Sequence, residues 1–211
     1  MPRKPAHEQF DTLKVIEDCS FELFGRYGYD GVSIGDISKA ARLSKSALYW
    51  HFQGKEELYL HCQQRLHRLF ETHVFEPMRQ ELQPLRGVQR LFDGLRTLMM
   101  DPQVARGIAG YWLTPSMADD ARPHQSQRAF EAAAVATLRG VLQKASDRGD
   151  LDLGRDLDDL PQAMISLVEA CVLPLRHLRP DEMHRTLDVL ARSLFRAYAR
   201  SDDARALTRA I

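Results

Sequence analysis

Hydrophobic residues recur at steps of three and four along almost the whole chain, which is the spacing of helices with one buried face. Near the N-terminus the pattern runs through Leu13, Ile16, Cys19, Leu23, Phe24 and Tyr27. Gly28 follows as a residue that readily ends a helix. No run alternates apolar and polar residues well enough to predict a strand. The pattern therefore predicts an all-α protein whose first helix covers about residues 8–27.

Two short segments with serine caps follow the first helix. Ser33 precedes a segment that ends near residue 40; its hydroxyl can accept a backbone N–H, and Asp36 suits the positive end of a helix. Ser44 begins the same arrangement before a segment of about seven residues that reaches Trp50. The sequence predicts two short helices in tandem, joined by a tight turn.

Longer helical patterns fill the rest of the chain. From Lys55 an amphipathic helix is predicted to run to just before Pro77, because proline interrupts helical hydrogen bonding. Prolines and one glycine separate further helices, predicted at about residues 86–100, 102–114, 125–148, 156–177 and 181–200, with a polar loop over about residues 114–125. We expect one domain over residues 1–54 and a second over residues 55–211, without a flexible linker between them.

Charge is balanced overall but unevenly distributed. The 211 residues suffice for a substantial core, and the formal net charge is zero. This balance argues against a protein that coats nucleic acid by bulk charge. The stretch from Ile37 to Lys55, however, carries Lys39, Arg42, Lys45 and Lys55 and no acidic residue. A local basic surface is therefore predicted there.

Cysteine usage and apolar runs favour the cytoplasm. The chain has 3 cysteines, an odd and scattered set that does not suit a secreted disulfide framework. The first eight residues are polar, and no apolar run approaches the roughly 20 residues needed to span a bilayer. We expect a cytoplasmic protein with no membrane partner.

The second short helix has the composition of a recognition helix that enters the DNA major groove. Leu48 and Phe52, four residues apart, are predicted to face inward, which turns the small, basic and aromatic residues between Ser44 and His51 outward. Lys45 could reach guanine acceptors and Trp50 thymine methyls. The predicted DNA-binding residues are Ser33, Arg42, Ser44, Lys45, Ser46, Ala47, Tyr49, Trp50, His51 and Lys55. Ser33, Tyr49, His51 and Lys55 are the expected phosphate contacts. The alternative is a set of packed helices with a solvated basic face.

These residues also resemble the signature of the TetR family of transcriptional regulators. The resemblance covers about residues 10–60 and rests, in order, on Gly28-Tyr29, Val32-Ser33-Ile34, Asp36-Ile37, Ala40-Ala41, Leu43-Ser44, Leu48-Tyr49, His51-Phe52 and Lys55-Glu56-Glu57-Leu58. It implies a three-helix DNA-binding domain, a helical domain for dimerisation and ligand binding, and repression of a near-palindromic operator that an effector relieves. An activator, or a regulator that senses a protein partner, stays open.

One position departs from the family pattern. The family commonly has glycine in the turn between the two short helices, where this sequence has Arg42. If the backbone there needs a positive φ, arginine costs about 1 kcal/mol of strain. Its charge could compensate by reaching a phosphate.

The last two predicted helices carry apolar stripes that need a partner. The resemblance implies that they pair with their copies in a four-helix bundle. The predicted dimerisation residues are Val168, Cys171, Val172, Leu175, Leu187, Leu190, Leu194 and Tyr198. The alternative is that these stripes complete the core of a monomer.

An effector pocket is expected between the long helix after Lys55 and the helices beyond it. Large flexible and aromatic side chains dominate its predicted walls, which favours an apolar or aromatic effector. The predicted ligand-binding residues are Leu66, Phe70, Phe92, Leu95, Met99, Tyr111, Trp112, Gln127, Phe130, Met164, Leu167 and Glu169. Tyr111, Gln127 and Glu169 are the possible polar anchors among them. Ordinary core packing is the alternative for each.

Enzymatic and metal chemistry are not favoured. The chain has no G-x-S-x-G, H-E-x-x-H, P-loop or C-x-x-C motif. His61, Cys62, His67 and His73 share one predicted helix, but six-residue steps between the histidines do not place them on one face. We expect no catalysis, no cofactor and no bound metal.

Overall fold

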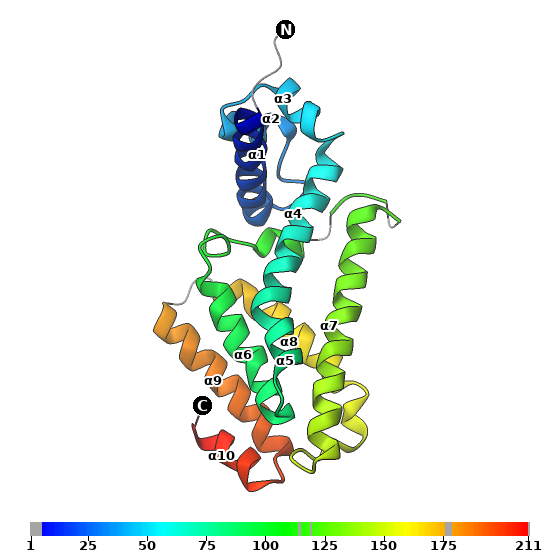
Figure 1. The fold of residues 1–211 in the computed structure, drawn as a ribbon, viewed down its shortest axis with the longest axis vertical. Helices are drawn as coiled ribbons and strands as arrows, with labels where there is room; N and C mark the ends of the chain where they lie inside the picture. Colours follow the sequence, from blue (N-terminus) through cyan, green and yellow to red (C-terminus); the bar gives the residue numbers. More distant parts are fainter. Residues whose placement is uncertain (1–5, 114, 119, 176–178, 211) are drawn as a thin grey trace. The chain divides into compact units, whose positions relative to one another are not determined.

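A computed structural model of the chain describes residues 6–113, 115–118, 120–175 and 179–210, and these form helices joined by turns (Figure 1). Within these ranges the structure has no strand; Leu151 and Ala199 form one isolated bridge. The all-α prediction is therefore confirmed. No described helix is long and apolar enough to cross a membrane.

The chain divides into two compact units. The N-terminal unit comprises Met1–Leu66 and Pro102–Gln127, and the C-terminal unit comprises His67–Asp101 and Arg128–Ile211. These units do not coincide with the expected division after residue 54. The start of the long helix and the segment 102–127, both expected in the second domain, pack with the N-terminal helices.

The N-terminal unit is built on α1 (Ala6–Tyr27), α2 (Ile34–Ala41), α3 (Lys45–His51) and the first part of α4 (Lys55–Phe70). Their order and approximate bounds agree with the prediction. Their inward faces form a common core in which the fully buried side chains include Ile16, Phe24, Ile37, Leu48, Leu58 and Tyr59. The predicted inward residues Leu48 and Phe52 are indeed buried.

The helix after Lys55 does not end before Pro77, so that prediction is wrong. A π-helical turn, η1 (Glu71–Phe75), follows α4 directly, and α5 (Glu76–Gln80) continues from it. The wider turn absorbs the break, because the amide of Glu76 bonds five residues back to the carbonyl of Glu71. Pro77 has no N–H to donate to the carbonyl of His73, and this carbonyl lies against Gly94.

The prediction of a helix over residues 102–114 is also wrong. Only one 3₁₀ turn, η2 (Ala109–Trp112), forms there. Gly107 has a φ of 115°, which is incompatible with a helix, and Gly110 packs its backbone directly on α1. The following helix α7 (Arg122–Asp147) begins slightly earlier than predicted, with Pro123 in its first turn, where proline is tolerated.

The C-terminal unit contains η1, α5, most of α7, and four further helices. These are α6 (Pro84–Met100), α8 (Leu160–Leu175), α9 (Pro180–Tyr198) and α10 (Asp202–Ala210), with a 3₁₀ turn η3 (Gly154–Leu157) before α8. Helix α6 packs on η1, α5 and α9. Helix α10 was not predicted; its start is marked by Ser201, whose hydroxyl accepts the N–H of Ala204.

Candidate nucleic-acid interface

Helix α2 begins with a complete capping box. The Ser33 hydroxyl accepts the backbone N–H of Asp36 at 3.1 Å, and the Asp36 carboxylate accepts the backbone N–H of Ser33 at 2.8 Å. The hydroxyl of Ser33 and then its backbone N–H lower the pKa of Asp36. Since the carboxylate form is favoured, the cap is intact at neutral pH and weakens only as pH falls through this lowered pKa. Ser33, expected at a phosphate, thus also fixes the start of α2.

The turn between α2 and α3 places Arg42 in the left-handed region. Its φ is 56° and its ψ is 38°, and it is the one non-glycine residue with positive φ in the part of the chain that the structure describes. The amide of Arg42 bonds to the carbonyl of Lys39, and that of Leu43 to Ser38. The conformation that favours glycine is therefore required here, and an exposed arginine adopts it.

Replacing Arg42 by glycine is expected to raise the free energy of unfolding by about 1 kcal/mol, because glycine adopts positive φ without strain. Urea unfolding followed by far-UV circular dichroism measures the gain. Arg42→Lys is the matched control, since lysine keeps the strain and the charge. Equal stability of the glycine variant and the native chain would show that the turn stores no strain.

Helix α3 presents basic and aromatic side chains to solvent. Trp50 is 69% exposed and Tyr49 is 55% exposed. Lys45 and Ser46 are exposed as well, as predicted. The Ser44 hydroxyl caps the helix by accepting the N–H of Ala47 at 3.2 Å. Because α3 contains no acidic residue, its outer face suits the negative surface of a DNA groove.

Aromatic contacts hold two of the predicted phosphate-binding side chains. The ring of half-buried His51 meets that of Trp50 edge to face, with centroids 5.0 Å apart. The Lys55 ammonium lies 3.9 Å from the centroid of the Tyr29 ring, at the positive end of α4. The role of Tyr29 was not predicted, although an aromatic residue directly after Gly28 was a visible signal.

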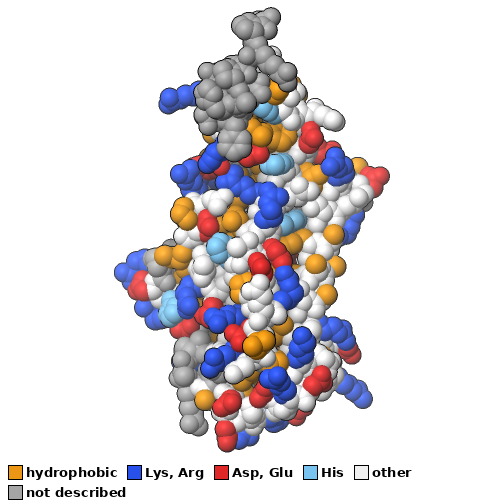
Figure 2. All heavy atoms as spheres, viewed as in Figure 1, with side chains coloured by type: hydrophobic (Ala, Val, Ile, Leu, Met, Phe, Trp, Pro, Cys, Tyr) orange, Lys and Arg blue, Asp and Glu red, His pale blue; other side chains and the backbone are white. Residues whose placement is uncertain are grey.

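The surface as a whole carries no excess of basic side chains. On the face shown in Figure 2, Lys and Arg side chains are interspersed with Asp and Glu. This agrees with the formal net charge of zero. Attraction to DNA must therefore come from a local arrangement of charges.

The predicted ligand-binding residues fall in both units. Leu66, Tyr111, Trp112 and Gln127 belong to the N-terminal unit, and the C-terminal unit holds Phe70, Phe92, Leu95, Met99, Phe130, Met164, Leu167 and Glu169. The Tyr111 hydroxyl donates to the carbonyl of Phe21 at 3.1 Å, and Gln127 accepts from the buried Gln63 at 3.3 Å. The structure therefore gives no support to Tyr111 as an effector anchor in this conformation.

Two groups of predicted ligand-binding residues do come together in the C-terminal unit. Phe130 stacks on His67 with ring centroids 4.1 Å apart, and Phe70 lies 5.9 Å away at its edge. Separately, Phe92, Leu95, Met164 and Leu167 line an apolar cavity of about 30 Å³ between α6, α8 and α9. This volume is far below the roughly 300–1,000 Å³ of small-molecule sites.

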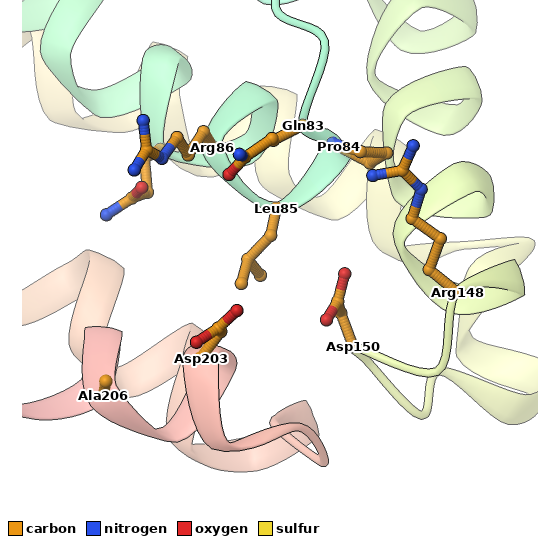
Figure 3. A pocket seen from close by; sticks show the side chains of 9 residues that line it. Gln83, Pro84, Leu85, Arg86, Arg148, Asp150, Asp203 and Ala206 are labelled. Atoms are coloured by element: carbon orange, nitrogen blue, oxygen red, sulfur yellow. The ribbon is translucent and has the colours of Figure 1, made fainter.

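A larger hollow of about 700 Å³ has different chemistry. Figure 3 shows its walls, which come from the start of α6, the segment just after α7, and α10. Asp150 and Asp203 face Leu85 across the space, and Arg148 lies beside Asp150. None of the predicted ligand-binding residues lines it. Its open, charged walls do not suit the apolar effector that the sequence favours.

The predicted dimerisation residues lie on α8 and α9. Val168, Leu190 and Leu194 are half-buried and Leu187 is buried, all four around the 30 Å³ cavity. The side chains of Cys171, Val172 and Leu175 lie outside the described residues. The Tyr198 hydroxyl donates to Asp156 at 2.8 Å within the same chain.

The four metal candidates on the long helix have separate environments. His61 pairs with Glu17 at 2.8 Å, His73 with Asp101 at 3.3 Å, and His67 stacks on Phe130. Cys62 is fully buried, and burial raises the pKa of its thiol. Among the described residues no group of three His, Cys, Asp or Glu side chains is placed to hold a metal.

Residues 17–62, from α1 to the first half of α4, match the family model of bacterial regulatory proteins, tetR family. Over these residues the chain is similar to the TetR family. The matched segment contains both serine caps and the exposed helix α3. The TetR family comprises transcriptional regulators, which are generally not enzymes.

Two relatives resemble this chain over about a quarter of its length. The HTH-type transcriptional regulator AcrR of Shigella flexneri is 39% identical over 59 residues, which cover 28% of this chain and 27% of that protein. The biofilm operon icaADBC HTH-type negative transcriptional regulator IcaR of Staphylococcus epidermidis is 46% identical over 46 residues, which cover 22% and 24%. The chain thus spans about a quarter of the length of these relatives.

The likeness to solved structures extends further. The crystal structure of AibR in complex with isovaleryl coenzyme A and operator DNA matches with a TM-score of 0.69 and 19% identity, covering 85% of this chain and 97% of that chain. At this identity the match shows a shared fold. The predicted arrangement of an N-terminal helix-turn-helix followed by a helical domain is confirmed.

Proposed function

We propose that this protein is a transcriptional repressor that binds operator DNA with α3 in the major groove. The observation that carries the proposal is the outer face of α3, where Lys45, Tyr49 and Trp50 are exposed and acidic residues are absent. A buried Leu48 and two serine caps hold this face in place. The name of the relative IcaR, a negative regulator, supports repression.

The exposed residues divide into two roles in this proposal. Lys45 and Trp50 read base edges, because an ammonium can donate to guanine acceptors and an indole can pack on a thymine methyl. Ser33, Arg42, Tyr49, His51 and Lys55 contact phosphates and fix the register of the protein on the duplex. Ser44, Ser46 and Ala47 line the start of α3, where its N–H groups point toward the groove.

The active species in this proposal is a homodimer, because one helix-turn-helix contacts too few bases for tight specific binding. Exposed apolar side chains on α8 and α9 support the pairing. Leu167 is 46% exposed and Val189 is 51% exposed, although both are large apolar residues. Pairing these helices with their copies would cover both side chains and place two α3 helices on one palindrome.

The proposed effector is a small apolar or aromatic molecule that binds the C-terminal unit and releases the operator. The apolar cavity around Leu95 and Met164 and the ring stack around Phe130 support this chemistry. The cavity must widen to admit an effector, which is how a ligand could favour a conformation with lower DNA affinity. The structure of AibR in complex with isovaleryl coenzyme A and operator DNA has a similar fold, so this fold accommodates both partners in AibR. We assign the DNA-binding domain to residues 1–54, with Lys55 adding a phosphate contact from the start of the next domain. We assign effector binding and dimerisation to residues 55–211, and the site of action to the cytoplasm.

Selection from a random DNA library tests this function. The full-length protein is expected to enrich one near-palindrome whose half-sites are about one helical turn, 34–36 Å, or a multiple of it apart. The double variant Lys45→Ala/Trp50→Ala is expected to enrich a more relaxed consensus. Recovery of unrelated sequences by the native protein, at the level of the starting library, would refute specific operator binding.

A further inference from the structure

The connection between α6 and α7 packs its backbone directly on α1 within the N-terminal unit. We call residues 102–116 the clasp. A Cβ atom on Gly110 would lie 2.2 Å from the carbonyl oxygen of Phe24, and one on Gly25 would lie 2.2 Å from that of Gly107. No side chain other than hydrogen fits at either contact. One glycine on each of the two segments therefore lets the clasp and α1 touch.

Polar contacts tie the clasp to α1 along its length. Arg106 pairs with Glu22 at 3.0 Å, and its carbonyl accepts from the guanidinium of Arg26 at 3.2 Å. The buried Tyr111 hydroxyl donates to the carbonyl of Phe21, and burial raises the pKa of this phenol, which keeps it a donor. At the start of the clasp, Gln103 accepts from Arg65, which also pairs with Asp18 at 2.7 Å.

From the clasp, a chain of aromatic contacts reaches the proposed phosphate-binding lysine. The Tyr111 ring stacks on Tyr59 with centroids 5.7 Å apart, and Tyr59 meets Tyr29 at 5.2 Å. The Tyr29 ring carries the Lys55 ammonium. A displacement of Tyr111 would thus change the packing that positions Lys55.

The far end of the clasp fixes the carboxylate next to this lysine. Ser116 donates its backbone N–H to Asp30 at 2.8 Å, and its hydroxyl also bonds to this carboxylate. These two bonds, and more weakly the charge of Lys55, lower the pKa of Asp30. Asp30 is therefore ionised and held by the clasp, within electrostatic range of Lys55.

The other end of the clasp continues directly from α6, which lines the apolar cavity of the C-terminal unit. Residues Leu91, Phe92 and Leu95 of α6 contribute to that cavity. The backbone of α6 touches the π-helical turn at Gly94, where an added Cβ would lie 2.4 Å from the carbonyl oxygen of His73. This close contact restrains α6, and the clasp is the segment of chain that directly follows α6.

We propose that the clasp sets the DNA affinity of the helix-turn-helix by positioning Lys55, and that movement of α6 regulates it through this segment. The inference rests on the proposed function of operator binding. It adds a second covalent route from the C-terminal unit to the DNA-binding helices, besides α4. Gly110, Tyr111 and Ser116 are positioning residues in this account.

The test is a double-mutant cycle measured by fluorescence polarisation on selected operator DNA. Gly110→Ala is expected to weaken binding by about fivefold or more, a magnitude typical of allosteric coupling, and Tyr111→Phe to weaken it less. Either effect is expected to shrink to less than half in a Lys55→Ala background, because the clasp acts through that lysine. Gly140→Ala is the matched control, since an added Cβ there meets nothing within 4 Å.

Hydrogen exchange of the native chain gives an independent readout. Coupling is reciprocal, so operator DNA is expected to slow amide exchange in residues 103–113, even if Gly110→Ala fails to fold. Clasp variants that bind like the native protein, effects that simply add to those of Lys55→Ala, or unchanged exchange would each overturn the inference and leave operator binding intact. Failure of the native protein to bind DNA would instead remove the proposed function and the inference with it.

Discussion

A chain carrying both Leu167→Glu and Val189→Glu is expected to be monomeric at micromolar concentration. These two apolar side chains are exposed on α8 and α9, where a carboxylate would disrupt the proposed pairing but is tolerated in a monomer. The variant is expected to lose at least about a hundredfold in affinity for a palindromic operator, because two linked half-sites bind that much more tightly than one. Sedimentation equilibrium and fluorescence polarisation measure the two effects.

Leu82 offers the matched control for this pair. It is 87% exposed, lies between α5 and α6, and belongs to no proposed interface. Leu82→Glu is expected to remain dimeric with native affinity. A native chain that sediments as a monomer, or a double variant that stays dimeric, would contradict pairing through α8 and α9.

Lys55→Ala is expected to weaken binding to operator and unrelated DNA alike. Each lysine lost from a phosphate contact removes a charge-assisted hydrogen bond, and a dimer loses two of them. The affinity for DNA is therefore expected to fall by about tenfold or more. The slope of log affinity against log salt concentration is expected to fall by about two per dimer, since two counterion-releasing contacts disappear. A salt series with both DNA molecules measures this.

Lys144→Ala controls for the change in net charge. Lys144 is exposed near the end of α7 and has no proposed role in DNA binding. Its removal is expected to leave affinity and salt slope unchanged. If the two lysine variants behave alike, Lys55 acts only through bulk charge, and its assignment as a phosphate contact is wrong.

Local signals explain why the helix-turn-helix could be predicted from the sequence. Ser33, Asp36 and Ser44 make their capping bonds within three residues along the chain, so their roles were visible without tertiary structure. The inward positions of Leu48 and Phe52 follow from helical periodicity alone. Arg42 was recognised as unusual for the same reason, because the turn geometry is local.

Long-range contacts explain what could not be predicted. The π-helical turn before Pro77 is held against Gly94 of a later helix, and the clasp is pressed on α1 through Gly110. Nothing in the sequence around either glycine indicates which distant segment it will contact. Tyr111 was predicted as a possible polar anchor for an effector, and the sequence gives no sign that its hydroxyl bonds to a carbonyl 90 residues earlier.

The effector-binding residues stay predictions. Aromatic and aliphatic side chains at helical spacing serve core packing and ligand binding equally, so periodicity does not separate the two. The structure groups Phe92, Leu95, Met164 and Leu167 around a cavity of about 30 Å³. A pocket that opens only with its ligand cannot be delimited from residue types.

The most direct test of the central claim is binding of the native protein to DNA from its own promoter region, measured across a salt series with nonspecific competitor. The account predicts saturable binding to a near-palindrome with two chains per site. It also predicts that affinity falls steeply with salt yet survives an excess of competitor. If competitor DNA abolishes binding at every salt concentration, the account is contradicted.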